Sequence, residues 1–213
     1  MRRAAAPLLA LALLAGCGGG DRITQTRELA PFDRLEVADS VAVEVVPGDG
    51  RDVRVYGGED VLDRVETESS GGVLRIDIRD RGIVIGPDPL GDVRVEVAAS
   101  ALEAVTIGGA SQVRLDGFDA ERLDIEVEGA GSVAASGTVG RLSATIEGAA
   151  DADLSGLAAR TAVVVVEGAA DADLKVSESL DVRIEGAADV TYRGDPIVTR
   201  EVHGAGDIER VGP

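Results

Sequence analysis

IEGAADA (residues 146–152) and VEGAADA (residues 166–172) are two copies of one short phrase that decides the fold of this chain. Four looser copies surround them: IGGASQV begins at residue 107, VEGAGSV at 127, IEGAADV at 184 and VHGAGDI at 202. Successive copies begin 18 to 20 residues apart. Self-similarity at such a fixed period is typical of a solenoid, in which each unit buries its apolar face only against its neighbours.

Apolar and polar residues alternate on both sides of each phrase, which is the period of a strand with one buried face. LSATIE (residues 142–147) places Leu, Ala and Ile on one side, and DADL (residues 151–154) continues with Ala and Leu inward. The glycine between two such strands fits a corner that needs a positive φ or a close backbone approach. We expect the alanine after it to be small because a stacked corner leaves little room. The predicted corner glycines are Gly109, Gly129, Gly148, Gly168, Gly186 and Gly204.

The sequence therefore predicts an all-β fold, with a parallel β-helix (solenoid) of 18–20 residues per turn over residues 101–213. Parallel crossovers are generally right-handed, so we expect a right-handed coil. Residues 29–100 lack the phrase and predict a β-rich N-terminal lobe, although residues 29–213 could also form one continuous domain. In the lobe, PGDG (47–50) and SGG (70–72) favour hairpin turns, and residues 59–65 a short helical turn.

Residues 1–16 have the pattern of a signal peptide, with Arg2 and Arg3 before an apolar stretch at residues 8–14. That stretch is far shorter than the ~20 residues that span a bilayer. LAGC (14–17) resembles a bacterial lipobox, in which Cys17 would become the first mature residue and carry the lipid. We therefore predict a lipidated cysteine and flexible tether over residues 17–28. The expected location is the cell envelope, outside the cytoplasm, at the periplasmic face of the outer membrane or the cell surface.

Charge and aromatic content exclude several classes of partner. The formal net charge of −18 argues against nucleic acid, whose binding depends on cationic contacts to phosphate, and against an anionic membrane surface. The chain has no Trp, two Tyr and two Phe, so aromatic platforms for sugars or bases are scarce. The lipid anchor is therefore the expected contact with the membrane.

Stacked phrases would place acidic side chains in outward columns, with Glu128 in one of them. Like charges about 4.8 Å apart repel by roughly 1 kcal/mol in water, which calcium ions could relieve. The alternative is a solvated acidic surface that keeps solenoids apart. The spacing does not match the nine-residue calcium repeat, and no other cofactor is expected. The candidate cation ligands are Glu147, Glu167, Glu185, Asp151, Asp153, Asp171, Asp173, Asp189 and Asp207.

Catalytic motifs are missing, so we expect no enzymatic activity. His203 is the single histidine and Cys17 the single cysteine, and the lipid would occupy that cysteine. No G-K-[ST] follows the glycine phrases, which therefore are not phosphate-binding loops. A pair of acids acting on a polysaccharide remains the enzymatic alternative.

The chain resembles the bacterial GIN-domain family, described as putative auto-transporter adhesin head domains, over roughly residues 32–210. FDRLEV (32–37) matches its opening strand, the six phrases match its repeated corner in outline, and YRGDP (192–196) with GAG (204–206) matches its closing motif. The corners depart from the family because glutamate replaces its first serine in four copies. The resemblance implies the β-helical fold and a role in surface adhesion.

These observations predict a non-enzymatic envelope lipoprotein that acts as a binding or scaffold module. Its expected partner is an envelope protein or polysaccharide. Two alternatives stay open: a passive structural or sensory-accessory lipoprotein without a ligand, and a polysaccharide-active β-helix enzyme.

Overall fold

The computed structural model describes residues 22–79, 93–99 and 102–212. The predicted signal peptide and the lipidation site at Cys17 lie outside these residues, and both stay predictions. No helix in the described part of the chain is long and apolar enough to cross a membrane.

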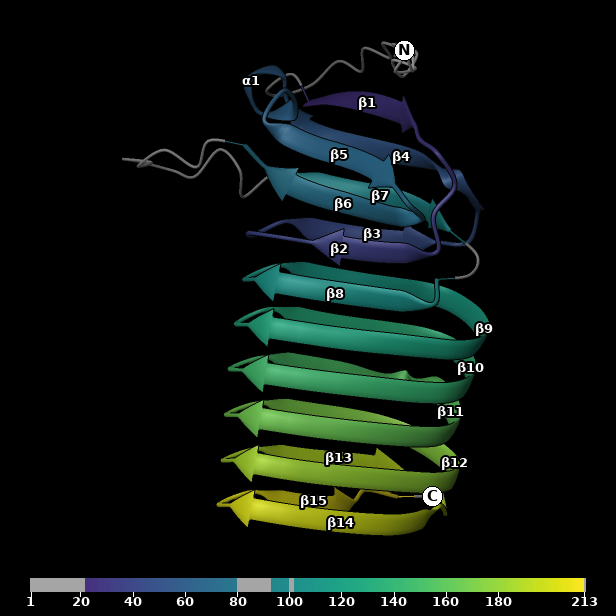
Figure 1. Cartoon of the computed structure of the whole chain (residues 1–213), viewed down its shortest axis with the longest axis vertical. Coiled ribbons are helices and arrows are strands. Elements are labelled where there is room, and N and C mark those ends of the chain that lie inside the picture. The colour runs from purple at the N-terminus through teal and green to yellow at the C-terminus, as the bar shows by residue number, and fades with distance from the viewer. Residues whose placement is uncertain (1–21, 80–92, 100–101, 213) are drawn as a thin grey trace, which may run out of the picture.

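The structure is an all-β solenoid whose strands form one hydrogen-bonded sheet, coiled into a flattened stack with two broad faces (Figure 1). The prediction of an all-β fold is confirmed. The described elements are, in chain order, β1 (Arg22–Glu28), β2 (Arg34–Val37), β3 (Ala42–Val46), β4 (Asp49–Gly58), α1 (Glu59–Leu62), β5 (Val65–Ser70), β6 (Val73–Ile78), β7 (Arg94–Ala99), β8 (Ala104–Gly109), β9 (Gln112–Gly129), β10 (Ser132–Gly148), β11 (Asp151–Gly168), β12 (Asp171–Gly186), β13 (Asp189–Arg193), β14 (Ile197–Gly204) and β15 (Asp207–Arg210).

Each of the long strands β9 to β12 forms most of one turn of the coil. It runs along the back face of Figure 1, passes round one edge, which we call the bend edge, and returns along the front face to a corner glycine. Seen from the N-terminal end, the chain turns clockwise as it moves away, so the coil is right-handed as predicted. Neighbouring turns pair in parallel and in register, with Ile146 of β10 opposite Val127 of β9 and Val166 of β11.

The core consists of apolar columns that run along the solenoid axis, because in-register pairing places equivalent residues of each turn above one another. One such column is Leu123, Leu142, Ala162 and Leu180, all at most 2% exposed. Burying a leucine side chain stabilises a fold by about 1.5–3 kcal/mol, so the aliphatic columns supply the main driving force. Ser111 is the one fully buried polar residue in the described part of the chain.

The corner glycines form a tight backbone spine at the edge opposite the bend edge. All six have positive φ, from +69° at Gly109 to +140° at Gly204. A Cβ added at Gly148 would lie 2.3 Å from the carbonyl oxygen of Gly129 in the preceding turn. That same oxygen accepts a hydrogen bond of 2.8 Å from the amide of Ala149. The corner therefore requires glycine both for its φ and for this close approach.

The small residue that the corner requires is not the alanine after each glycine, as the sequence suggested. Those alanines are exposed, whereas the next residue is buried: Ala150 and Ala170 are 2% and 3% exposed. Asp39 forms a further corner without glycine, at φ +68°. Its carbonyl oxygen accepts hydrogen bonds from the amide of Ala110 at 2.8 Å and from the Ser111 hydroxyl at 3.1 Å.

The N-terminal lobe continues the same sheet. β2 pairs with β8, and β3 pairs with β9, so strands on both sides of residue 100 are hydrogen-bonded to each other. The division into a lobe and a solenoid at that residue stays a prediction. The SGG hairpin between β5 and β6 is confirmed, with Gly71 and Gly72 at φ +62° and +84°. The helical turn is confirmed as α1.

Two expectations for the lobe were wrong. Residues 22–28 are not tether but strand β1, which pairs antiparallel with β4 and packs Ile23 against the core. PGDG does not form a hairpin, because β7 lies between β3 and β4 and pairs with both. A later segment of the chain thus takes the place that a hairpin partner would occupy.

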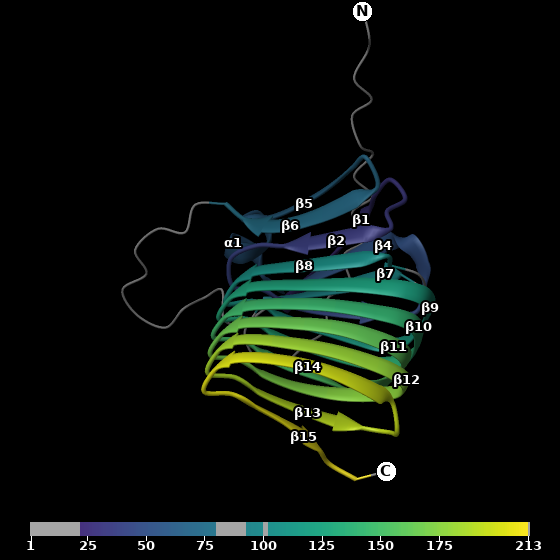
Figure 2. The same ribbon diagram turned by 60° about the horizontal axis from the view of Figure 1, so that its bottom comes forward.

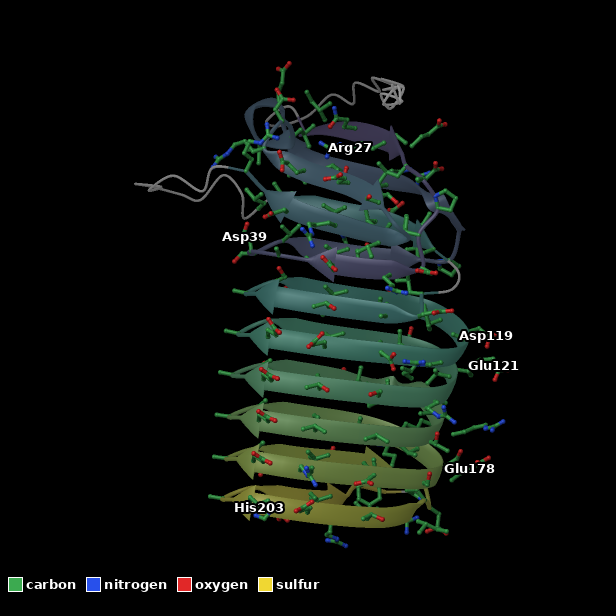
Figure 3. The ribbon with its side chains drawn as sticks, in the orientation of Figure 1. Arg27, Asp39, Asp119, Glu121, Glu178 and His203 are labelled. Atoms are coloured by element: carbon green, nitrogen blue, oxygen red, sulfur yellow. The ribbon has the colours of Figure 1, made fainter. Side chains whose placement is uncertain are left out.

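Arg27 closes the N-terminal end of the solenoid (Figure 3). Its guanidinium donates hydrogen bonds to the carbonyl oxygens of Val65 (2.6 Å) and Leu62 (3.0 Å) and to the Thr67 hydroxyl (3.0 Å). Burial lowers the pKa of Arg27, yet an arginine stays protonated at physiological pH. One side chain thereby fastens β1 to α1 and β5.

Candidate functional site

A hollow of about 480 Å³ opens on the back face, where β3, β7 and the first parts of β9, β10 and β11 lie side by side. We call it the back-face groove. Two outward columns cross it, and each contains short side chains beside longer ones: Ala42 and Ser132 in the first, and Ala134 in the second. The first column is Arg94, Ala42, Gln112, Ser132 and Asp151, and the second is Glu44, Arg114, Ala134 and Asp153.

Ion pairs fix the N-terminal wall of the groove. Arg94 Nη2 lies 2.6 Å from Glu44 Oε2, and the Glu44 side chain is 25% exposed. Two residues after Arg94 on β7, Glu96 accepts hydrogen bonds from Arg54 Nη1 (2.6 Å) and from the Tyr56 hydroxyl (3.2 Å) of β4. The hydrogen bond to Glu96 raises the pKa of Arg54, and burial is the main cause that raises the pKa of Tyr56. These paired side chains hold the wall in one arrangement.

Arg114 lies at the centre of the groove and offers a free cation. It is exposed, and within the described residues its side chain has no hydrogen bond or ion pair. Its register places it between Glu44 and Ala134. A guanidinium presents several donors in a fixed plane, so Arg114 suits an acceptor on a ligand, such as a carboxylate or carbonyl oxygen.

The opposite wall supplies acceptors. Asp153 Oδ1 accepts hydrogen bonds from the amide (3.2 Å) and hydroxyl (2.7 Å) of Ser155, which orient the carboxylate. Asp151 is exposed beside it, and Gln112 and Ser132 lie between the two walls. The groove therefore offers donors at Arg114 and acceptors at Asp151 and Asp153, as a polar ligand with groups of both kinds requires. None of the described residues that line it is aromatic.

The acidic columns predicted from the phrases are present. Glu128, Glu147, Glu167 and Glu185 are in register on the front side of the corner, and Asp151, Asp171, Asp189 and Asp207 on the back side, with Asp153 beside Asp173. Nowhere in the described ranges do three or more His, Cys, Asp or Glu side chains form a group that could hold a metal ion. Cation binding by these columns stays a prediction, which a rise in melting temperature specific to calcium over magnesium would support.

His203 takes the last place in the glutamate column, at the C-terminal end of the stack (Figure 3). Its Nε2 lies 2.9 Å from Glu201 Oε1, and Arg183 Nη2 lies 2.6 Å from Glu201 Oε2. The hydrogen bond from His203 and then that from Arg183 lower the pKa of Glu201. In the described part of the chain, the hydrogen-bond partner of His203 is Glu201 and not a hydroxyl group.

A second hollow, of about 650 Å³, lies at the bend edge. Small residues such as Ala120, Ala159 and Gly140 form its floor. Asp119 and Glu121 project from this edge (Figure 3), and Arg160 and Lys175 also line the hollow. Arg160 Nε lies 3.6 Å from Glu178 Oε1, so charges of both signs gather at this edge.

Sequence reasoning missed Gln112, Arg114, Ser132 and Ala134, because no single copy of the phrase marks them as unusual. A signal was nevertheless present. Aligning the copies at their 18–20-residue period shows Arg114 and Ala134 where later copies carry Asp153 and Asp173. The change from Arg114 and Ala134 to Asp153 and Asp173 along one column marks the place where the surface changes shape and charge.

Comparison with known proteins adds a family and several structural neighbours. A family model described as "Putative auto-transporter adhesin, head GIN domain" matches residues 31–196. A putative adhesin from Bacteroides fragilis has a TM-score of 0.72 at 19% identity, covering 89% of this chain and 97% of its own. No curated protein matches the sequence.

Two proteins from Parabacteroides distasonis are also similar in structure. One is called a putative lipid binding protein, with a TM-score of 0.53, and the other a putative adhesin, with a TM-score of 0.52. Each is 18% identical and covers 91% of this chain and 98% of its own. Likeness at this identity shows that the fold is shared.

Proposed function

Because the chain belongs to the family described as "Putative auto-transporter adhesin, head GIN domain", we propose that it is a non-enzymatic binding module of the cell envelope. The back-face groove is the observation that carries this proposal. It combines a free guanidinium at Arg114, oriented acceptors at Asp153 and a rigid wall at Glu44 and Arg94. A rigid sheet carrying a polar groove can bind a partner without any chemical step.

The partner that the groove fits best is a polar segment of an envelope protein. Backbone amides and carbonyls of such a segment would meet the acceptors of Asp151 and Asp153 and the donors of Arg114. A polysaccharide is less favoured, because aromatic side chains on which sugars stack are absent from the groove. The neighbour called a lipid binding protein shares the fold at 18% identity, so its name supplies no ligand for this chain.

A lipid on Cys17 would hold the module at the membrane. Each buried methylene contributes about 0.8 kcal/mol, so several acyl chains anchor a protein firmly. The chain would then stand at the periplasmic face of the outer membrane or at the cell surface, with the groove facing sideways from the axis of the stack. Mass spectrometry of the N-terminal peptide would detect the lipid.

Ala134→Arg fills the groove and tests the site. The arginine adds bulk and a second charge between Arg114 and Asp153, so retention of the purified protein on isolated envelope fractions should fall about tenfold, the effect of ~1.4 kcal/mol. Ser143→Arg is the matched control, because it places the same side chain on the same strand but on the front face. It should leave retention unchanged.

Treating the envelope fraction with protease identifies the class of partner. Loss of retention after digestion supports a protein partner, whereas loss after glycan hydrolysis alone would indicate a polysaccharide. Equal retention of the Ala134→Arg variant and the unchanged protein would show that the groove is not the site. If no envelope fraction retains the unchanged protein, the module has no ligand there, and a passive structural role replaces this proposal.

A further inference from the structure

The N-terminal end of the solenoid is covered by other elements, whereas the C-terminal end has exposed strand edges. Arg27, α1 and β1 close the N-terminal end. The C-terminal end consists of β14 and β15, and among the described residues each has a strand partner on one side only: β14 pairs with β12 and β15 with β13 (Figure 2). The free side of β14 is an eight-residue strand edge with backbone groups available for pairing.

The inward positions of this last strand are Val198, Arg200 and Val202, which continue the columns of Leu180, Val182 and Ile184. In the column that ends at Arg200, the four preceding residues are apolar and at most 2% exposed: Ile125, Ala144, Val164 and Val182. An arginine thus replaces the apolar residue in the last turn that the structure describes. Within the described residues, the Arg200 side chain has no hydrogen bond or ion pair.

The same edge also exposes apolar side chains. Ile197 is 80% exposed and Val202 is 38% exposed, and both are among the few large apolar residues that the described surface displays. On β15, Arg210 continues the column of Tyr192 and pairs with Asp195 at 3.0 Å. The edge therefore combines free backbone groups, flanking valines and an unpaired cation, on a chain with a net charge of −18.

The charge of Arg200 determines which kind of strand can pair with the free edge of β14. Two copies meeting end to end would bring Arg200 of each together, and like charges directly opposite on paired strands are unfavourable. A strand with a carboxylate opposite Arg200 would form a charge-assisted hydrogen bond instead. The arginine thus acts against self-association and in favour of an acidic partner.

We propose that β14 binds an extended segment of a partner protein by β-strand addition, and that Arg200 selects a segment with the pattern apolar-x-acidic-x-apolar. The apolar residues cover Val198 and Val202, and the carboxylate pairs with the guanidinium. Main-chain hydrogen bonds supply affinity and the alternate side chains supply specificity, as in other edge-strand recognition. This site is separate from the back-face groove.

Three synthetic peptides of sequence TVTXTVT, with X as glutamate, glutamine or lysine, test the proposal. Fluorescence anisotropy measures their affinity for the purified protein. The glutamate peptide should bind about tenfold more tightly than the lysine peptide, with the glutamine peptide between them. In the Arg200→Glu variant the order should reverse. Backbone NMR shifts caused by binding should be confined to β14, β15 and the residues paired with them.

Matched variants separate this site from other effects. Arg193→Glu makes the same charge change at an exposed position of β13 that pairs with Lys175 and not with β14, and should leave the order of affinities unchanged. Ala134→Arg should not alter peptide binding. The proposal for the back-face groove and the proposal for β14 can therefore be refuted independently of each other. An unchanged peptide order in Arg200→Glu, shifts centred outside β14, or no binding at millimolar peptide would each overturn the proposal.

Discussion

Gly148→Ala should lower the free energy of unfolding by roughly 4 kcal/mol or more, among the largest effects of a single substitution. Two costs add at this position. At φ +110° an alanine is strained by about 1–3 kcal/mol. Its Cβ would also lie 2.3 Å from the Gly129 carbonyl oxygen, so successive corners must move apart. That shift weakens the hydrogen bond between the amide of Ala149 and the same oxygen.

Substitutions at two other glycines separate the cost of backbone strain from the cost of the steric clash. Gly71 has φ +62° but open space around its Cβ position, so Gly71→Ala should cost only about 1 kcal/mol of strain. Gly58 has φ −72° and also has open space, so Gly58→Ala should change stability by less than about 0.5 kcal/mol. Urea unfolding followed by circular dichroism gives all three values. A Gly148→Ala variant as stable as Gly58→Ala would contradict the corner geometry.

Val164→Lys should unfold the protein or cost at least about 4–5 kcal/mol, because it places a long charged side chain at a position that is 0% exposed. The neighbouring residue provides the control. Val163 points outward on the same strand and is 47% exposed, and it lies in register with Ser143 and Asp181. Val163→Lys should therefore stay within about 0.5 kcal/mol of the unchanged protein.

Thermal unfolding and soluble yield of the two variants report on the direction of each side chain. The two variants differ only in the direction of the lysine side chain, because the type of substitution, the strand and the turn are the same. Similar losses in both variants would mean that the alternation along β11 is not the one described. A loss confined to Val163→Lys would mean that the strand is turned over.

The repeats carried most of the fold information. A phrase recurring every 18–20 residues, with strict alternation around it, was enough to predict parallel turns, their register and the corner at Gly148. These features are local, because each turn contacts only its neighbours. The acidic columns followed from the same register, since residues at one period of the sequence must share a column.

The lobe was harder to predict because its pairing is not local. β7 lies between β3 and β4, although β3 and β4 are adjacent in sequence, and no local pattern announces that insertion. Arg27 likewise joins segments nearly 40 residues apart. The corner at Asp39 was missed because it has no glycine, and its positive φ is supported by Ser111 instead.

The candidate site was partly visible in the sequence. Asp151 and Asp153 were singled out for their charge, but the groove arises from the short side chains of Ser132 and Ala134 beside Arg114. Shape of this kind depends on which small residue meets which large one across turns. Sequence composition predicts the charge of such a surface but not where its grooves lie.

In-register cysteines test the central claim most directly, because the groove, the acidic columns and the edge at Arg200 all depend on equivalent residues sharing a column. With Cys17 changed to serine, Glu147→Cys and Glu167→Cys lie opposite each other on β10 and β11. Their Cα atoms should be about 4.8 Å apart, within the range that a disulfide bridges. The pair Glu147→Cys and Val165→Cys is offset by two residues, at roughly 8 Å, beyond that range.

Mass spectrometry after mild oxidation measures the outcome. We expect the in-register pair to form an intrachain disulfide in nearly all molecules, while the offset pair stays reduced. Equal oxidation of both pairs, or oxidation of the offset pair alone, would contradict the stacked register and everything built upon it.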